Sequence, residues 1–108
     1  MKSNSEKEVE VRLSLVQGDE SIGTLLYLAA PPGFDFPGEE TYTQDADHPT
    51  VPNYITARIL IPNIKKGVNQ PVTIKIKAPA RKRKFDLCCR IVCSGFDSGE
   101  KWFSVVVK

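Results

Sequence analysis

The chain has 108 residues, of which 41% are apolar and 26% are charged, and its formal net charge is +2. This composition is ordinary for a globular protein. The length predicts one domain that buries a two-layer core without disulfides or a metal ion. No apolar run approaches the roughly 20 residues of a membrane-spanning helix, which excludes an integral helical membrane protein.

The N-terminus is polar and lacks the apolar region of a signal peptide. We expect residues 1–7 to form a flexible lead and residues 8–108 to form the single domain. The cysteines, Cys88, Cys89 and Cys93, are odd in number and lack the spacing of a zinc site. Unpaired cysteines and the absent signal peptide favour a cytoplasmic location without establishing it.

The first half of the chain predicts two strands followed by a long loop. Residues 8–16 alternate between apolar and polar side chains, and residues 17–21 form a turn. Residues 22–29 are a second apolar run, which Pro31, Pro32 and Gly33 stop. Residues 30–53 contain five prolines and predict an irregular loop, in which 34–36 and 41–43 have the composition of short strands.

The second half predicts four more strands, at residues 54–62, 71–78, 85–94 and 102–107. Turn residues separate them, with Gly67 in one connection and Gly95 and Gly99 in another. The strands at 71–78 and 85–94 alternate clearly, so each has one apolar and one largely polar face. The sequence leaves open whether these two strands pair as a hairpin or lie in different sheets.

This pattern predicts an all-β protein, an antiparallel β-sandwich of about seven strands. A closed barrel is the alternative. The core is expected to comprise the inward residues of the alternating strands: Val9, Val11, Leu13, Leu15, Ile55, Ile59, Val72, Ile74, Ile76, Phe85, Leu87, Cys89 and Ile91.

Residues 59–94 resemble the second half of immunoglobulin-like and fibronectin-III-like modules. The resemblance rests on Ile61, Gly67, the alternating residues 72–76, Ala78-Pro79 and the aromatic Phe85. Residues 28–34, Leu-Ala-Ala-Pro-Pro-Gly-Phe, resemble a further segment of such modules. The antibody pattern of two cysteines spanning the sheets around a tryptophan is absent. The resemblance implies that the β-sandwich is immunoglobulin-like. It also implies a non-catalytic spacer or binding domain, although fold alone does not fix function.

Charge is distributed unevenly along the chain. Five acids and no Lys or Arg lie in residues 30–53, giving −5, whereas eight bases and no acid lie in residues 62–84, giving +8. We predict that the basic segment binds an anionic partner, an acidic protein or a polyanion. The residues expected to contact it are Lys75, Lys77, Arg81, Lys82, Arg83, Lys84 and Arg90. In the competing interpretation, the exposed lysines bind no partner and only prevent strand edges of different molecules from associating.

The acidic loop suggests a second contact surface. Phe34, Phe36 and Tyr42 lie among Asp35, Glu39 and Glu40, and aromatic side chains on loops often contact partners. Alternatively, the rings fold back and cap the open end of the sandwich. A third possibility joins the two charged regions, because the acidic loop of one copy can meet the basic segment of another.

Catalytic and metal chemistry find little support in the sequence. Asp45, Asp47 and His48 are candidate cation ligands, but the spacing of a calcium-binding EF-hand loop is missing. Cys88 is expected to face outward near Lys84 and Arg90, which would lower its thiol pKa. With a single histidine and no orienting partner, we expect no enzyme, no cofactor and no small-molecule substrate.

We therefore expect a non-catalytic interaction or structural module with a protein partner. The alternative is a C2-like module that docks on anionic membranes through Lys75, Lys77 and the basic connector.

Overall fold

The computed structural model describes residues 1–14, 20–21, 23–65, 67–93 and 96–108. These residues form ten β-strands and no helix, and seven of the strands have four or more residues. All pairings between them are antiparallel. The predicted all-β, antiparallel class is therefore confirmed.

One sheet has six strands. Its order is β10 (Lys101–Val106), β8 (Lys84–Cys93), β3 (Leu25–Ala30), β5 (Ile55–Leu60) and β4 (Glu40–Thr43). The short strand β9 (Phe96–Asp97) pairs with β8 off this path. β4 confirms the short strand expected at 41–43, whereas the stretch at 34–36 contributes a single bridge, from Asp35 to Lys77.

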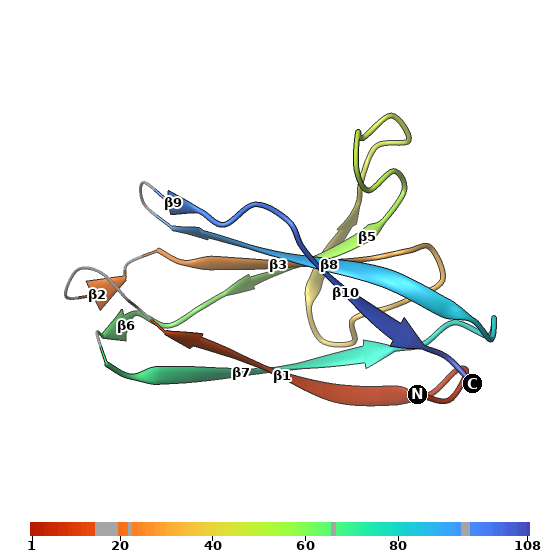
Figure 1. Cartoon of the computed structure of the whole chain (residues 1–108), viewed down its shortest axis with the longest axis horizontal. Coiled ribbons are helices and arrows are strands. Elements are labelled where there is room, and N and C mark those ends of the chain that lie inside the picture. Colours follow the sequence, from red (N-terminus) through yellow and green to blue (C-terminus); the bar gives the residue numbers. More distant parts are fainter. Residues whose placement is uncertain (15–19, 22, 66, 94–95) are drawn as a thin grey trace.

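The other pairings are smaller. β1 (Glu6–Ser14) pairs with β7 (Asn69–Lys77) along nine residues, and β2 (Glu20–Ser21) pairs with β6 (Ile64–Lys65). Figure 1 shows the β1–β7 sheet as a layer below the six-stranded sheet, with both termini at the same end of the molecule. The sheets are separate. The described strands therefore do not form a closed barrel, which was the alternative fold that the sequence did not exclude.

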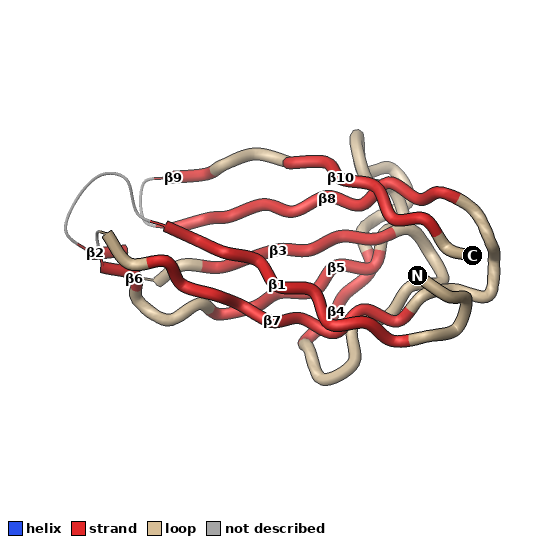
Figure 2. Tube along the Cα trace, turned by 60° about the horizontal axis from the view of Figure 1, so that its bottom comes forward, coloured by secondary structure: helices blue, strands red, loops and turns tan. Residues whose placement is uncertain are grey.

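The strands at 71–78 and 85–94 lie in different layers. β7 pairs with β1, whereas the next strand, β8, pairs with β10 and β3. The connector between them therefore crosses from one layer to the other (Figure 2). Because the two strands do not form a hairpin, the charges on their polar faces do not share one surface.

The core lies between the two layers, where the apolar faces of their strands meet. Ile74 and Ile76 of β7 belong to the same buried cluster as Leu26 and Leu28 of β3 and Leu87 of β8. Of the predicted core residues, Leu13, Ile74, Ile76, Phe85 and Leu87 are buried, and Val9, Val11, Ile55, Ile59, Val72, Cys89 and Ile91 are partly buried against them. Leu15 lies outside the described residues.

Met1, Ser3 and Asn4 form backbone hydrogen bonds with residues that are distant in the sequence. Ser3 N–H donates to the Lys108 carbonyl at 3.0 Å, and Lys108 N–H donates to the Met1 carbonyl at 2.8 Å. Asn4 N–H donates to the Pro79 carbonyl at 3.2 Å. The strand begins at Glu6, two residues before the expected domain boundary, and the flexibility of residues 1–7 stays a prediction.

Gly33 is the turn residue for which the packing demands glycine. Its φ is +102°, and a Cβ built there would lie 3.0 Å from the Cβ of Pro79. We expect Gly33→Ala to lower the free energy of unfolding by about 1–3 kcal/mol, because it adds both backbone strain and a steric clash. Urea unfolding measures this.

Gly38→Ala is the matched control. Gly38 also has a positive φ, +83°, but a Cβ there meets nothing within 4 Å. Equal losses in the two variants would show that the contact with Pro79 is not the constraint.

Candidate functional site

The predicted basic residues fall into three separate environments. Lys75 and Lys77 project from the outer face of β7, directly across from Glu8 and Glu6 of β1. Opposite charges at facing positions of an antiparallel pair attract each other. The outer face of this small sheet carries Glu6, Glu8 and Glu10 against Arg12, Lys75 and Lys77, so its charges balance. Lys75 and Lys77 therefore belong to a neutral face and not to a basic one.

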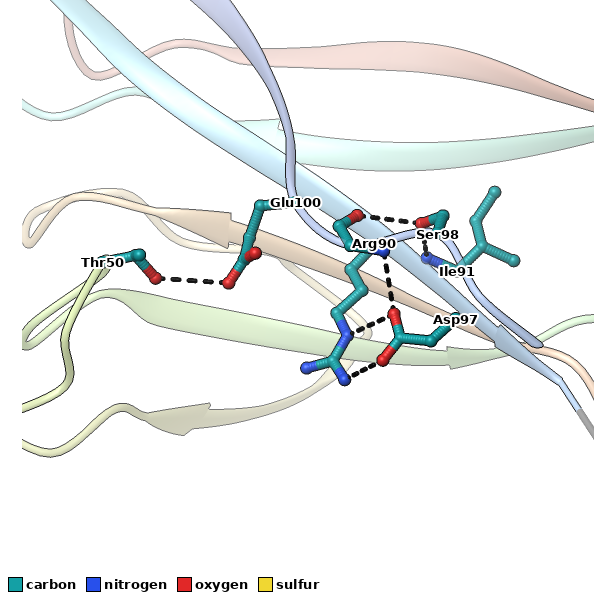
Figure 3. A network of polar contacts seen from close by, with 7 residues as sticks. Thr50, Arg90, Ile91, Asp97, Ser98 and Glu100 are labelled. Atoms are coloured by element: carbon teal, nitrogen blue, oxygen red, sulfur yellow. Dashed lines mark hydrogen bonds and ion pairs between the residues drawn. The ribbon is translucent and has the colours of Figure 1, made fainter. Parts of the chain in front are cut away.

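Arg90 lies on the other layer and is held by an acid. Its guanidinium forms an ion pair with Asp97 and donates from Nε to Oδ1 at 2.9 Å (Figure 3). The hydrogen bonds from Arg90 and from the Gly99 N–H lower the pKa of Asp97 to about 2. The sequence left open whether Arg90 shares one surface with Lys75 and Lys77, and it does not, because β7 and β8 lie in different layers.

The four remaining cations, Arg81, Lys82, Arg83 and Lys84, form what we call the cationic connector. All four are exposed, and none forms an ion pair with a described residue. The backbone beneath them is anchored, since Val107 N–H donates to the Arg83 carbonyl at 2.9 Å. The Arg83 guanidinium lies 5.0 Å from the centre of the Phe85 ring, which is an attractive cation–π geometry.

Phe34 and Phe36 are core residues rather than contact residues. Their relative exposures are 4% and 1%, and Phe34 packs edge-on against Phe85 with 5.1 Å between ring centres. A partner cannot reach either ring, which corrects their assignment as loop contacts. Both rings instead fold back into the buried core, as in the alternative stated above. Tyr42 is 43% exposed and remains accessible.

Tyr42 and Arg90 both line a recess of about 280 Å³ on the outer face of the six-stranded sheet. Its floor follows from the strand register, which aligns Trp102, Cys88, Ala29, Thr56 and Tyr42 in one row across five strands. The three central side chains of this row are small and the two outer ones are aromatic. The recess lies over the three small side chains, and Tyr42 lines its β4 end.

The adjacent row adds polar groups to the recess. Arg90 lies opposite Tyr27, which lies opposite Arg58. Glu100 lines the same recess and accepts a hydrogen bond from the Thr50 hydroxyl at 3.2 Å (Figure 3). The recess thus combines aromatic rings with a cation and a carboxylate, all of them engaged with neighbouring side chains.

The loop at residues 44–54 covers one end of the recess. Val51 packs on Ala29 and Cys88, and the ring of Tyr54 packs edge-on against Trp102 at 6.4 Å between centres. His48 organises this loop, because its Nδ1 accepts hydrogen bonds from the backbone N–H groups of Thr50 and Val51 at 3.2 and 3.1 Å. This histidine acts as an internal cap of the loop.

The loop acids next to His48 do not assemble a metal site. Across the described ranges, no three His, Cys, Asp or Glu side chains are arranged to hold a metal ion. The Asp45 carbonyl instead accepts backbone hydrogen bonds from His48 and Asn53, which closes the loop.

Cys88 does lie on the outer face of its strand, but the loop covers it. Its relative exposure is 4%, and burial, together with Glu100 and Cys89, raises the pKa of its thiol to about 11. Burial also raises the pKa of Cys89. The lowered pKa expected from Lys84 and Arg90 is therefore wrong, since Asp97 pairs with Arg90 and the desolvated thiol favours its neutral form.

No protein-family model matches the sequence, and no curated protein shows significant similarity to it. The described part of the chain also contains no helix that is long and apolar enough to cross a membrane.

The recess residues Tyr27, Gln44, Thr56 and Glu100 were not singled out from the sequence. Thr56 is buried at the floor, where the Gln44 amide lies 3.4 Å from its hydroxyl. The alternation of residues 54–62 places Thr56 on the face away from the core. This was the one feature of the sequence that could have pointed to the recess. The register across β4, β5 and β3 decides which residues meet, and a single sequence does not give that register.

A protected Cys88 predicts slow alkylation. With a thiol pKa of about 11, roughly one molecule in a thousand carries the thiolate at about pH 8. Iodoacetamide labelling followed by peptide mass spectrometry should modify Cys88 far more slowly in the folded protein than in urea. Val51→Ala removes part of the cover and should speed the labelling. Equal labelling in the folded and unfolded chain would contradict the buried placement.

The ion pair in Figure 3 predicts that the Asp97 carboxylate stays ionised at lower pH than an ordinary aspartate does. Because its pKa in the folded state is lowered to about 2, the stabilising contribution is present above the unfolded pKa of about 3.9 and is lost as pH falls towards 2. In Arg90→Gln the Asp97 titration midpoint should rise, as followed by carboxyl NMR. Arg58→Gln, on β5 and separated from Arg90 by β3, is the control, and an unchanged midpoint in Arg90→Gln would rule out the pairing.

Proposed function

We propose that this chain is a non-catalytic, immunoglobulin-like β-sandwich module that binds an acidic protein partner through its cationic connector. The fold part of the proposal is supported by the order in which strands alternate between the layers. β1 lies in the small sheet, β3 to β5 in the large one, β7 in the small one again, and β8 to β10 in the large one.

One observation carries the functional part: the connector presents four consecutive exposed cations that have no acidic partner among the described residues. Every other cation predicted for this surface is matched by a carboxylate, Lys75 and Lys77 across the strand pair and Arg90 in an ion pair. The connector is therefore the surface where an external anion would form the most favourable electrostatic contacts.

The connector is also held in place before a partner arrives. Ala78 and Phe85 are buried at its two ends, and its middle is hydrogen-bonded to Val107. A short segment with both ends fixed loses less conformational entropy on binding than a free tail does. This preorganisation favours specific recognition over diffuse attraction.

The number of free cations favours a protein over a membrane. A basic residue near an anionic membrane contributes about 1 kcal/mol, so four contribute about 4 kcal/mol, which corresponds to a millimolar dissociation constant. The C2-like alternative needs a broad basic face, and the cations of Lys75 and Lys77 are balanced by Glu8 and Glu6. A protein partner can add shape and hydrogen bonds to the same four charges.

The test replaces all four connector residues by glutamine and measures binding to immobilised polyglutamate by biolayer interferometry. Four exposed ion pairs at about 0.2–1 kcal/mol each, about 0.8–4 kcal/mol together, predict a loss of affinity of about fourfold or more. Binding by the unaltered protein should weaken steeply with salt. The charge-matched control, Lys75→Gln with Lys77→Gln, should change the affinity less than twofold.

Two outcomes would contradict the proposal. Equal binding by the fourfold variant would remove the connector as the site. Strong binding to vesicles of phosphatidylserine and phosphatidylcholine, with none to polyglutamate, would favour the membrane-docking alternative. Sedimentation of the protein alone at low and at high salt identifies self-association, which would compete for the same charges.

A further inference from the structure

The edge of β1 that faces away from β7 has no neighbouring strand. β1 runs for nine residues and pairs only with β7 in the described part of the chain. An unpaired strand of this length presents a row of backbone N–H and C=O groups to which another strand can bind.

The register identifies the free backbone groups. Lys77 exchanges two backbone hydrogen bonds with Asp35, at 2.8 and 3.1 Å, so its N–H and C=O point away from β1. In an antiparallel ladder, the residue opposite such a position also points away from its partner strand. Glu6 lies opposite Lys77, and the alternation then assigns Glu8, Glu10 and Arg12 to the free edge.

A strip of apolar side chains that are only partly covered lies beside this edge. Val9 and Val11, on the inner face of β1, are only partly buried. The same holds for Cys89 and Ile91 of β8 and for Phe103 and Val105 of β10 on the facing layer. Figure 2 shows β1 on the side of the small sheet that is nearer to β8 and β10. A further strand beside β1 would extend the small sheet over these side chains.

The opposite edge of the small sheet is blocked. The backbone groups of Lys77 point to the edge of β7 that faces away from β1, and residues an even number apart point to the same edge. Pro71, six residues before Lys77, therefore lacks its N–H on that edge. Asp35 occupies the other end of that edge. Proline and a covering segment are two devices by which sheet edges are closed to association. β1 has neither among its nine residues, so the two edges of one sheet differ in their availability.

We infer that β1 accepts an extended segment of another protein, in which apolar residues alternate with Lys or Arg. The apolar residues would lie beside Val9 and Val11 and cover the strip. The cations would lie on the outer face opposite Glu8 and Glu10, where opposite charges at facing positions are favourable. This site uses β1 and not the cationic connector, so it stands independently of the proposed function.

A second copy of the chain fits this edge less well. Antiparallel pairing of two complete β1 strands about their common centre places Glu10 opposite Glu10 and Glu8 opposite Arg12, whereas a cationic peptide faces every one of these glutamates with an opposite charge. Pairing β1 with β7 of another copy meets the blocked edge at Pro71 and Asp35. Like charges facing each other destabilise a strand pair.

The test uses a synthetic peptide of alternating isoleucine and lysine and follows amide hydrogen exchange by NMR. Exchange of the Glu8, Glu10 and Arg12 amides should slow by about tenfold or more when the peptide binds, while Val9 and Val11 change little because they already bond to β7. The same peptide with alternate backbone nitrogens methylated on its bonding edge should not bind. The fourfold glutamine variant of the connector should bind as the unaltered protein does.

Two variants keep the test decisive. Glu10→Pro removes one free N–H without removing a bond to β7, and should weaken peptide binding by about tenfold or more. If Glu10→Pro does not fold, Glu8→Lys with Glu10→Lys should reverse the charge preference towards a peptide of isoleucine and glutamate. Exchange protection elsewhere on the molecule, or equal binding by these variants, would overturn the inference. So would protection of Glu8 and Glu10 in the protein alone together with a dimer in sedimentation, because a second copy would then occupy the edge.

Discussion

Burial of the apolar faces of β7 and β8 in one core, from opposite layers, is the constraint on which the rest of the structure depends. Ile74 and Ile76 reach the core from the small sheet, and Phe85 and Leu87 reach it from the large one. Each strand alternates, so its polar face must then point to solvent on opposite sides of the molecule. The connector between the strands crosses the end of the core, and its side chains have no buried face to occupy.

Because the chain crosses between the layers, the charges of the basic segment lie on different surfaces of the molecule. Those on β7 lie across from acids of β1 and Arg90 pairs with Asp97, whereas the four connector cations have no acid at a facing position or in an ion pair among the described residues. The same crossing leaves the small sheet with two strands over a much wider one, so apolar side chains beside β1 are only partly covered. Both proposed contact surfaces, one electrostatic and one built on backbone pairing, thus follow from a single topological feature.

Local alternation was enough to predict the antiparallel class and much of the core, because the period of two reads directly as one buried face. It did not show that Phe34 and Phe36 are buried, since a loop has no period and its rings pack wherever the layers leave space. It placed Cys88 on the outer face of its strand. It did not show that Val51 covers Cys88, because these residues are 37 positions apart and only the tertiary structure brings them together. The recess depends on register between strands, which composition and periodicity leave undetermined.

The placement of β7 and β8 in different layers is tested most directly by NMR cross-peaks between backbone Hα atoms. Facing residues that do not exchange hydrogen bonds have closely spaced Hα atoms in an antiparallel pair. The structure predicts such cross-peaks between Glu6 and Lys77 and between Glu8 and Lys75. Hα cross-peaks between residues 71–78 and 85–94 instead would show a β7–β8 hairpin, reunite the basic residues on one face and contradict the account.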